Sequence, residues 1–161
     1  MGNALIGAEL TRTYTADEIA ADGRGFGVGD RYVDHLGNEY VFVQYGNGGA
    51  TANHAVSITA AGAAVMATNA VSLRGERVGV ALRAGAADSF GWAQIYGAVS
   101  VQTGEAAANA AMATTTTAGQ IDDAAGTGTK QILGLVLTTA RTGGAGLAPA
   151  FLSYPTIGAT N

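Results

Sequence analysis

The chain has 161 residues, of which 48% are hydrophobic and only 12% are charged, with a formal net charge of −4. This length suffices for one domain with a sizeable core, and charge is scarce because about a quarter of residues are charged in typical soluble domains. The one lysine and seven arginines are scattered along an acidic chain, which argues against a nucleic-acid partner. No apolar run reaches the roughly 18 residues of a membrane helix. The absence of cysteine excludes disulfides.

Residues 1–28 are predicted to form an extended N-terminal arm, and residues 29–161 a β-barrel or sandwich domain. The arm is Gly-rich, and residues 15–18 (TADE) fit a capping box ahead of one or two helical turns. An arm of this composition commonly docks on a neighbouring molecule. Three isolated apolar residues are its candidate anchors: Leu10, Tyr14 and Phe26.

A β-hairpin is predicted next. Residues 31–36 and 39–45 alternate or are rich in aromatic and β-branched side chains, and Gly37-Asn38 suits a two-residue turn of type I′ or II′. Residues 54–59 and 64–68 are predicted as short strands around a turn at Gly62. Residues 77–83 are predicted as a half-buried strand, with valines inward and an arginine at either end outward.

Residues 89–101 are predicted to be the central strand, because both of its faces are largely apolar and a strand of that kind is covered on both sides. Gly91 and Gly97 mark a bulge or a close backbone approach. One face carries the aromatic side chains and one amide: Phe90, Trp92, Gln94 and Tyr96. That face could be a sugar-stacking platform, although a core or a subunit interface is the commoner role.

The second half of the chain repeats this order of elements. Residues 105–112 are Ala-rich, which permits a helix by propensity, but the repeat favours a strand. A loop at residues 118–129 precedes a strand apolar on both faces at 131–139, and a last strand at 150–154 is expected to end before Pro155. Val56 precedes Val78 by 22 positions, and Ala110 precedes Ile132 by 22. The spacing indicates two similar β-units that together close one small barrel or sandwich.

Residue types give little support for catalysis. His35 is adjacent to Asp34 in a strand, where neighbouring side chains point to opposite faces, and His54 lies on the apolar parity of its strand. Asp122-Asp123 lacks the alternating oxygen ligands of a calcium loop, and no G-x-S-x-G elbow is present. We therefore expect no catalytic, metal-binding or cofactor-binding residues and no enzyme activity.

Several segments in succession resemble the decoration, or cement, proteins that tailed bacteriophages attach to the outside of their capsids. The most distinctive pieces are G-D-x-Y-V-x-x-x-G-N-E-Y and F-G-W-x-Q-x-x-G. The segments are GDRYVDHLGNEYVFVQY (29–45), HAVSITAAG (54–62), RVGVALRAGAADSFGWAQIYGAVSV (77–101) and ATTTTAGQIDDAAG (113–126), which leads into ILGLVL (132–137).

The resemblance implies a structural virion protein that binds the major capsid protein on the outer surface of the head and stabilises it. It also implies a homo-oligomer, for which we expect a trimer. The family has no catalytic residues to transfer, so the expected capsid or subunit contacts come from the sequence itself: Leu10, Tyr14, Phe26, Phe90, Trp92 and Tyr96. The alternative is a glycan-binding head-fibre or adhesin-like module that uses the aromatic strand.

Overall fold

The structure is a computed structural model that describes residues 8–21 and 27–161. Within those residues the only helix is α1 (Ala16–Ala21), so the chain is nearly all β, as predicted. The strands are β1 (Arg31–Val33), β2 (Glu39–Tyr45), β3 (Ala55–Ile58), β4 (Ala63–Met66), β5 (Arg77–Ala81), β6 (Phe90–Thr103), β7 (Met112–Thr114), β8 (Ile121–Asp122), β9 (Lys130–Leu137) and β10 (Gly146–Thr160).

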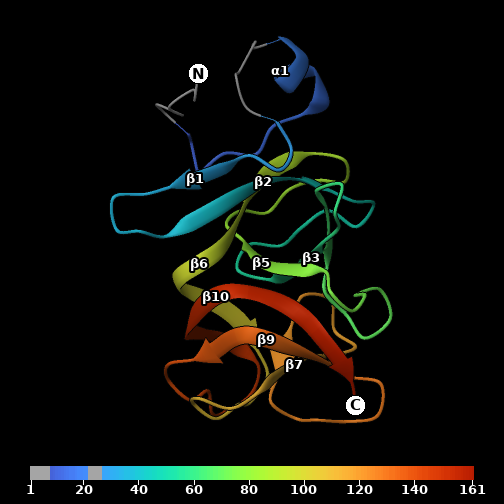
Figure 1. Cartoon of the computed structure of the whole chain (residues 1–161), viewed down its shortest axis with the longest axis vertical. Helices are drawn as coiled ribbons and strands as arrows, with labels where there is room; N and C mark the ends of the chain where they lie inside the picture. Colours follow the sequence, from blue (N-terminus) through green and yellow to red (C-terminus); the bar gives the residue numbers. More distant parts are fainter. Residues whose placement is uncertain (1–7, 22–26) are drawn as a thin grey trace.

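The strands close into two rings that share β6. The first ring runs β2-β4-β3-β5-β6 and returns to β2, and the second runs β6-β8-β7-β9-β10 and returns to β6. Figure 1 shows β1 and β2 in the upper part of the molecule, β3 and β5 near the middle, and β7, β9 and β10 in the lower part, with β6 running from the upper part to the lower one. The predicted central strand is therefore confirmed. Because each unit closes on itself, both rings avoid long exposed edges.

The two rings repeat one another down to single hydrogen bonds. The backbone N–H of Gly46 donates to the carbonyl of Ala64 over 2.9 Å, and that of Gly104 donates to Ile121 over 2.8 Å. In both rings the pair of strands joined there is parallel, whereas the neighbouring pairs are antiparallel. The predicted duplication is therefore a real repeat of structure, but its register differs: Gly46 and Gly104 lie 58 positions apart, whereas the predicted equivalents Val56 and Ala110 lie 54 apart.

A second pair of equivalent positions lies in the loops that precede β3 and β7. Asn53 and Asn109 have φ angles of 62° and 60°, in the left-handed region that asparagine tolerates better than most residues. Their backbone N–H groups donate to Ala81 and Leu137, over 2.7 and 2.9 Å. The same residue type therefore makes the same turn in both units.

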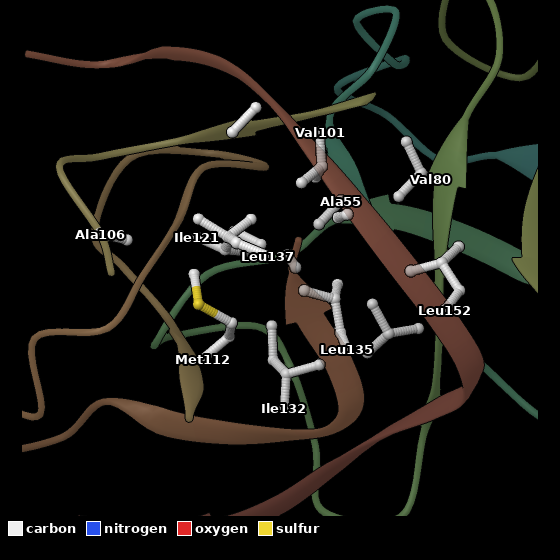
Figure 2. Packing of buried hydrophobic residues seen from close by; sticks show 14 of the residues in the cluster. Ala55, Val80, Val101, Ala106, Met112, Ile121, Ile132, Leu135, Leu137 and Leu152 are labelled. Atoms are coloured by element: carbon white, nitrogen blue, oxygen red, sulfur yellow. The ribbon is translucent and has the colours of Figure 1, made fainter. Parts of the chain in front are cut away.

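Each ring encloses its own buried cluster, and β5 lies between the two. In the first ring Val41, Val43 and Ile58 pack together and are nearly inaccessible. Figure 2 shows the larger cluster, in which side chains from β7 and β9 meet Leu152 of β10 and Val80 of β5. Val80 faces this second core while its neighbour Ala81 faces the first. For this reason β5 is buried on both faces rather than half-buried as predicted.

The predicted hairpin is present, but its turn is longer than expected. The strands end at Val33 and Glu39, and the N–H of Gly37, at φ 82°, donates to the carbonyl of Asp34. The Asp34 carboxylate accepts hydrogen bonds from the backbone N–H groups of Leu36 and Asn38, each over 2.9 Å. This side-chain cap favours a wider turn closed by Gly37 over a two-residue turn at Gly37-Asn38.

Two predictions for the second half were wrong. Residues 105–111 form neither a strand nor a helix, because Asn109 in the left-handed region cannot continue either element. Strand β10 continues to Thr160 instead of ending before Pro155. The register of β10 against β9 shifts between Leu152 and Thr156, and a proline is tolerated at such a bulge because no ladder donor is needed there.

Candidate functional site: an uncovered sheet face on the second ring

The outer face of the first ring is covered by the N-terminal segment of the same chain. Tyr14 forms an isolated bridge with Phe90, is 1% exposed, and packs edge-on against Phe42 with ring centroids 6.0 Å apart. The predicted capping box holds α1 beside it, with the N–H of Thr15 donating to Glu18 Oε2 and the N–H of Glu18 donating to Thr15 Oγ1. An apolar aromatic cluster is thereby removed from water.

The equivalent face of the second ring has no such cover among the described residues. Because Gly46 corresponds to Gly104, the cross-strand pair Phe42 and Trp92 corresponds to the pair Ser100 and Pro149. We call the exposed positions around that pair the second-ring face. They come from β6, β9 and β10: Ala98, Ser100, Val136, Leu147, Pro149 and Phe151.

The second-ring face is apolar and carries no charged side chain. Leu147 is 48% exposed, Phe151 38% and Val136 37%, although all three belong to regular strands. Val136 and Phe151 are directly paired across β9 and β10. Contiguous apolar surface of this kind is a candidate interaction site, because water solvates it poorly.

An aromatic row extends this face toward the first ring. Tyr96 meets Phe151 edge-on at a centroid distance of 5.5 Å and stacks on Tyr154 at 5.1 Å. Tyr154 is 47% exposed. Aromatic side chains bury large areas at interfaces while retaining a polar hydroxyl, so this row adds to the contact potential of the face.

The residues expected to make intermolecular contacts lie mostly inside the protomer. Tyr14 and Trp92 are each 1% exposed, and Phe90 stacks on Phe42 with ring planes 13° apart. Leu10 is half-buried against the same cluster, and Phe26 lies outside the described residues. Of the five expected residues that the structure describes, only Tyr96 lies next to the second-ring face.

This burial agrees with a core role for the aromatic strand, which the sequence favoured over an open platform. Trp92 packs against Phe42 with ring centroids 5.1 Å apart, and Tyr32 of β1 lies edge-on to it. A sugar ring would therefore find no exposed tryptophan face. Gln94 is also turned inward and donates hydrogen bonds to the carbonyls of Tyr96 and Ala98.

Sequence reasoning missed the residues that form the second-ring face. Leu147, Pro149 and Phe151 alternate with Ala148, Ala150 and Leu152, and both sets are apolar, so hydrophobic periodicity cannot tell the inner side from the outer one. Aligning the two units would have given the signal. When Phe90 and Trp92 are matched to Leu147 and Pro149, the latter two residues fall at the positions that the N-terminal segment covers in the first ring.

No chemical centre accompanies this face. His54 Nδ1 lies 2.9 Å from the carbonyl oxygen of Ala52, and His35 is exposed in the hairpin turn. Within residues 8–21 and 27–161, no group of three or more His, Asp and Glu side chains is placed to hold a metal ion. Over the same ranges, no helix combines the length and the apolar character needed to span a membrane.

The chain matches no protein-family model and no curated protein sequence.

Proposed function

We propose that the chain is a structural virion protein, a capsid decoration protein that binds the outer surface of the major capsid protein shell as a homotrimer and stabilises the phage head. The observation that carries this proposal is the second-ring face. It is apolar and uncharged, and it repeats a face that the chain itself covers on the first ring. Burial of such a surface against another molecule would supply the driving force for association.

Two further properties support the proposal. Few charged residues have to be desolvated when the chain is surrounded by neighbours, because only 12% of its residues are charged. Its 25 glycines and abundant alanines let backbones approach closely. Many copies on one shell would also bind with avidity, so modest affinity at each contact is sufficient. In this assignment the second-ring face joins neighbouring copies, and the oligomer presents a composite surface to the capsid.

The proposal is tested by co-sedimentation with empty shells of the major capsid protein encoded in the same genome, after light scattering has given the mass of the free protein. Phe151→Asp places a charge that an interface would have to desolvate. It is expected to lower the mass to that of a monomer and to weaken shell binding at least tenfold.

The matched control is Ala60→Asp, which adds the same charge at an exposed position in the turn between β3 and β4. It should leave both the oligomeric mass and shell binding unchanged. A wild-type monomer that does not sediment with the shells would contradict the proposal. Equal behaviour of the two variants would contradict the role of the second-ring face.

A further inference from the structure

A pocket of about 240 Å³ lies where the first ring meets β10. Its walls come from β1, β5, β6 and β10, so it exists only because the two rings are fused. It combines two cations, one aromatic ring and an apolar lining: Arg31, Arg77, Val78, Ile95, Tyr154 and Pro155. Val78 and Ile95 are themselves core residues, at 0% and 2% exposed, so they form a closed floor, and the accessible walls are the two arginines and Tyr154.

Tyr154 reaches this pocket because of the bulge in β10. Up to Leu152 the even-numbered residues point inward, whereas after the bulge the odd-numbered Pro155 and Ile157 do so. Tyr154 sits at the switch with a φ of 48°, a left-handed conformation that is unusual for an aromatic residue. A bulge that re-aims one side chain is a common device at binding sites.

Glu39 fixes two members of the pocket. The Tyr154 hydroxyl donates to Glu39 Oε1 over 2.6 Å, and Arg31 Nη1 lies 3.8 Å from Glu39 Oε2. The Arg31 guanidinium also lies 6.0 Å from the centre of the Tyr154 ring. Glu39 thus neutralises Arg31 and orients Tyr154.

The Arg77 guanidinium makes no hydrogen bond and no ion pair with the residues that the structure describes. With two arginines and one glutamate, the pocket has an excess of one positive charge in a chain whose net charge is −4. We infer that the pocket binds the carboxylate of an organic acid, with Arg77 as the charged partner and the apolar body of the acid against the exposed ring of Tyr154. Arginine pairs with carboxylates through two parallel hydrogen bonds, which gives such a site its specificity.

Charge and size both favour a small monoanion. A dianion such as a phosphate monoester would be repelled by Glu39, whereas a single carboxylate balances the excess charge. The volume of about 240 Å³ leaves room for one ring and its carboxylate. Either a free small molecule or one residue of a neighbouring protein can carry the carboxylate, and the chemistry at Arg77 is the same in both cases.

The inference is independent of shell binding and is tested on the full-length protein with three acids: acetate, benzoate and phenylacetate. Titration is followed by the NMR signal of the Arg77 Nε–H group. We expect shifts that saturate at lower concentration for the two aromatic acids than for acetate. Phenylacetamide, which has the same shape without the charge, should bind at least tenfold more weakly. Equal binding of the amide, or no shift of Arg77 with any acid, would overturn the inference.

Substitutions show whether the acids bind at this pocket or to arginines anywhere on the protein surface. Arg77→Gln should weaken phenylacetate binding at least tenfold, and Arg77→Lys should retain part of the affinity because it keeps the charge without the two-pronged geometry. Arg83→Gln, which removes an exposed arginine just beyond β5, is the control and should bind as the wild type does. Affinity that falls equally in Arg77→Gln and Arg83→Gln would refute a specific site.

A last comparison distinguishes the two sources of the carboxylate. If a neighbouring protein supplies it, Arg77→Gln will lower the oligomeric mass or the shell binding, and phenylacetate will compete with that association. If a free acid is the ligand, the mass and the shell binding of Arg77→Gln will equal those of the wild type while its affinity for phenylacetate falls. Both results support a carboxylate site at Arg77. Only the titrations with the three acids can contradict it.

Discussion

Glycines next to Tyr45 set how closely the strands of the first ring pack. A Cβ atom at Gly91 would lie 2.8 Å from the Tyr45 hydroxyl oxygen, and one at Gly85 would lie 2.5 Å from the ring. Tyr45 is fully buried, and this burial raises the pKa of its hydroxyl to about 12. The ring therefore stays neutral at any ordinary pH and has little room to move.

We predict that Gly91→Ala lowers the free energy of unfolding by about 1–3 kcal/mol, because overpacking in a filled core costs about that much. The measurement is equilibrium urea denaturation. Gly48→Ala is the matched control, since a Cβ there would meet no atom within 4 Å. Equal urea midpoints for the two alanine variants would contradict tight packing between Gly91 and Tyr45.

The hairpin turn is organised by one carboxylate, Asp34. Burial alone would raise its pKa, but hydrogen bonds from the Asn38 side chain, the Tyr40 hydroxyl and the backbone of Asn38 and Leu36 outweigh burial and lower the pKa to about 2. The Tyr40 pKa is raised to about 12, first by burial and then by this hydrogen bond. The turn thus depends on ionised Asp34 and protonated Tyr40.

A carboxyl group whose pKa is lower in the folded state stabilises the fold above its unfolded pKa and loses that contribution as the pH falls through the folded value. We therefore expect the part of the stability due to Asp34 to be complete above about pH 4 and to disappear toward about pH 2. Asp34→Asn should flatten the acid limb of a plot of urea midpoint against pH. An unchanged acid limb in the variant would show that Asp34 does not carry this pH dependence.

At the scale of elements, the N-terminal segment behaves as part of the first ring rather than as a free arm over the described residues 8–21. Tyr14 exchanges backbone hydrogen bonds with Phe90, over 2.7 and 2.8 Å, and its ring is buried. The segment therefore acts as a cover that keeps the aromatic face of β2 and β6 out of water.

Removal of this cover should be visible at the single tryptophan. We expect Tyr14→Ala to cost about 3 kcal/mol, as for other large buried side chains, and to raise the access of acrylamide to Trp92. The measurement is fluorescence quenching together with thermal melting, and Thr11→Ala, at an exposed position, is the control. Quenching that stays at the wild-type level in Tyr14→Ala would contradict the covering role.

The sequence was sufficient to predict the β-class, the central strand and the duplication, because these depend on apolar runs and glycines that recur at fixed spacing. It was insufficient for residues 105–111, where alanine has no strong preference and Asn109 adopts a left-handed conformation that composition does not reveal. The path of β10 through Pro155 was likewise hidden, since a proline ends a strand except at a bulge.

The site was harder to predict than the fold, for a physical reason. Aromatic residues were expected at an interface because they are large and apolar, but the same properties place Tyr14 and Trp92 in the core. The second-ring face is instead built from smaller residues and Phe151, whose exposure depends on which element lies above them. That information is in the topology and not in any local pattern.

At the scale of the whole molecule, both units form a similar ring of strands, but the described residues cover the outer face of the first ring only. One ring has its outer face covered by residues of its own chain, and the corresponding second-ring face exposes Leu147 and Phe151. With charge so scarce, an exposed apolar face is a solubility liability unless assembly covers it. Assembly on a shell would cover this face, which no residue in the described part of the chain covers.

We propose that this assembly strengthens a capsid, and the most direct test is the temperature at which empty shells rupture, followed by light scattering with and without the bound protein. We expect that saturating protein raises the rupture temperature and that Phe151→Asp at the same concentration does not. Shells that rupture at the same temperature although wild-type protein is bound to them would contradict the stabilising function.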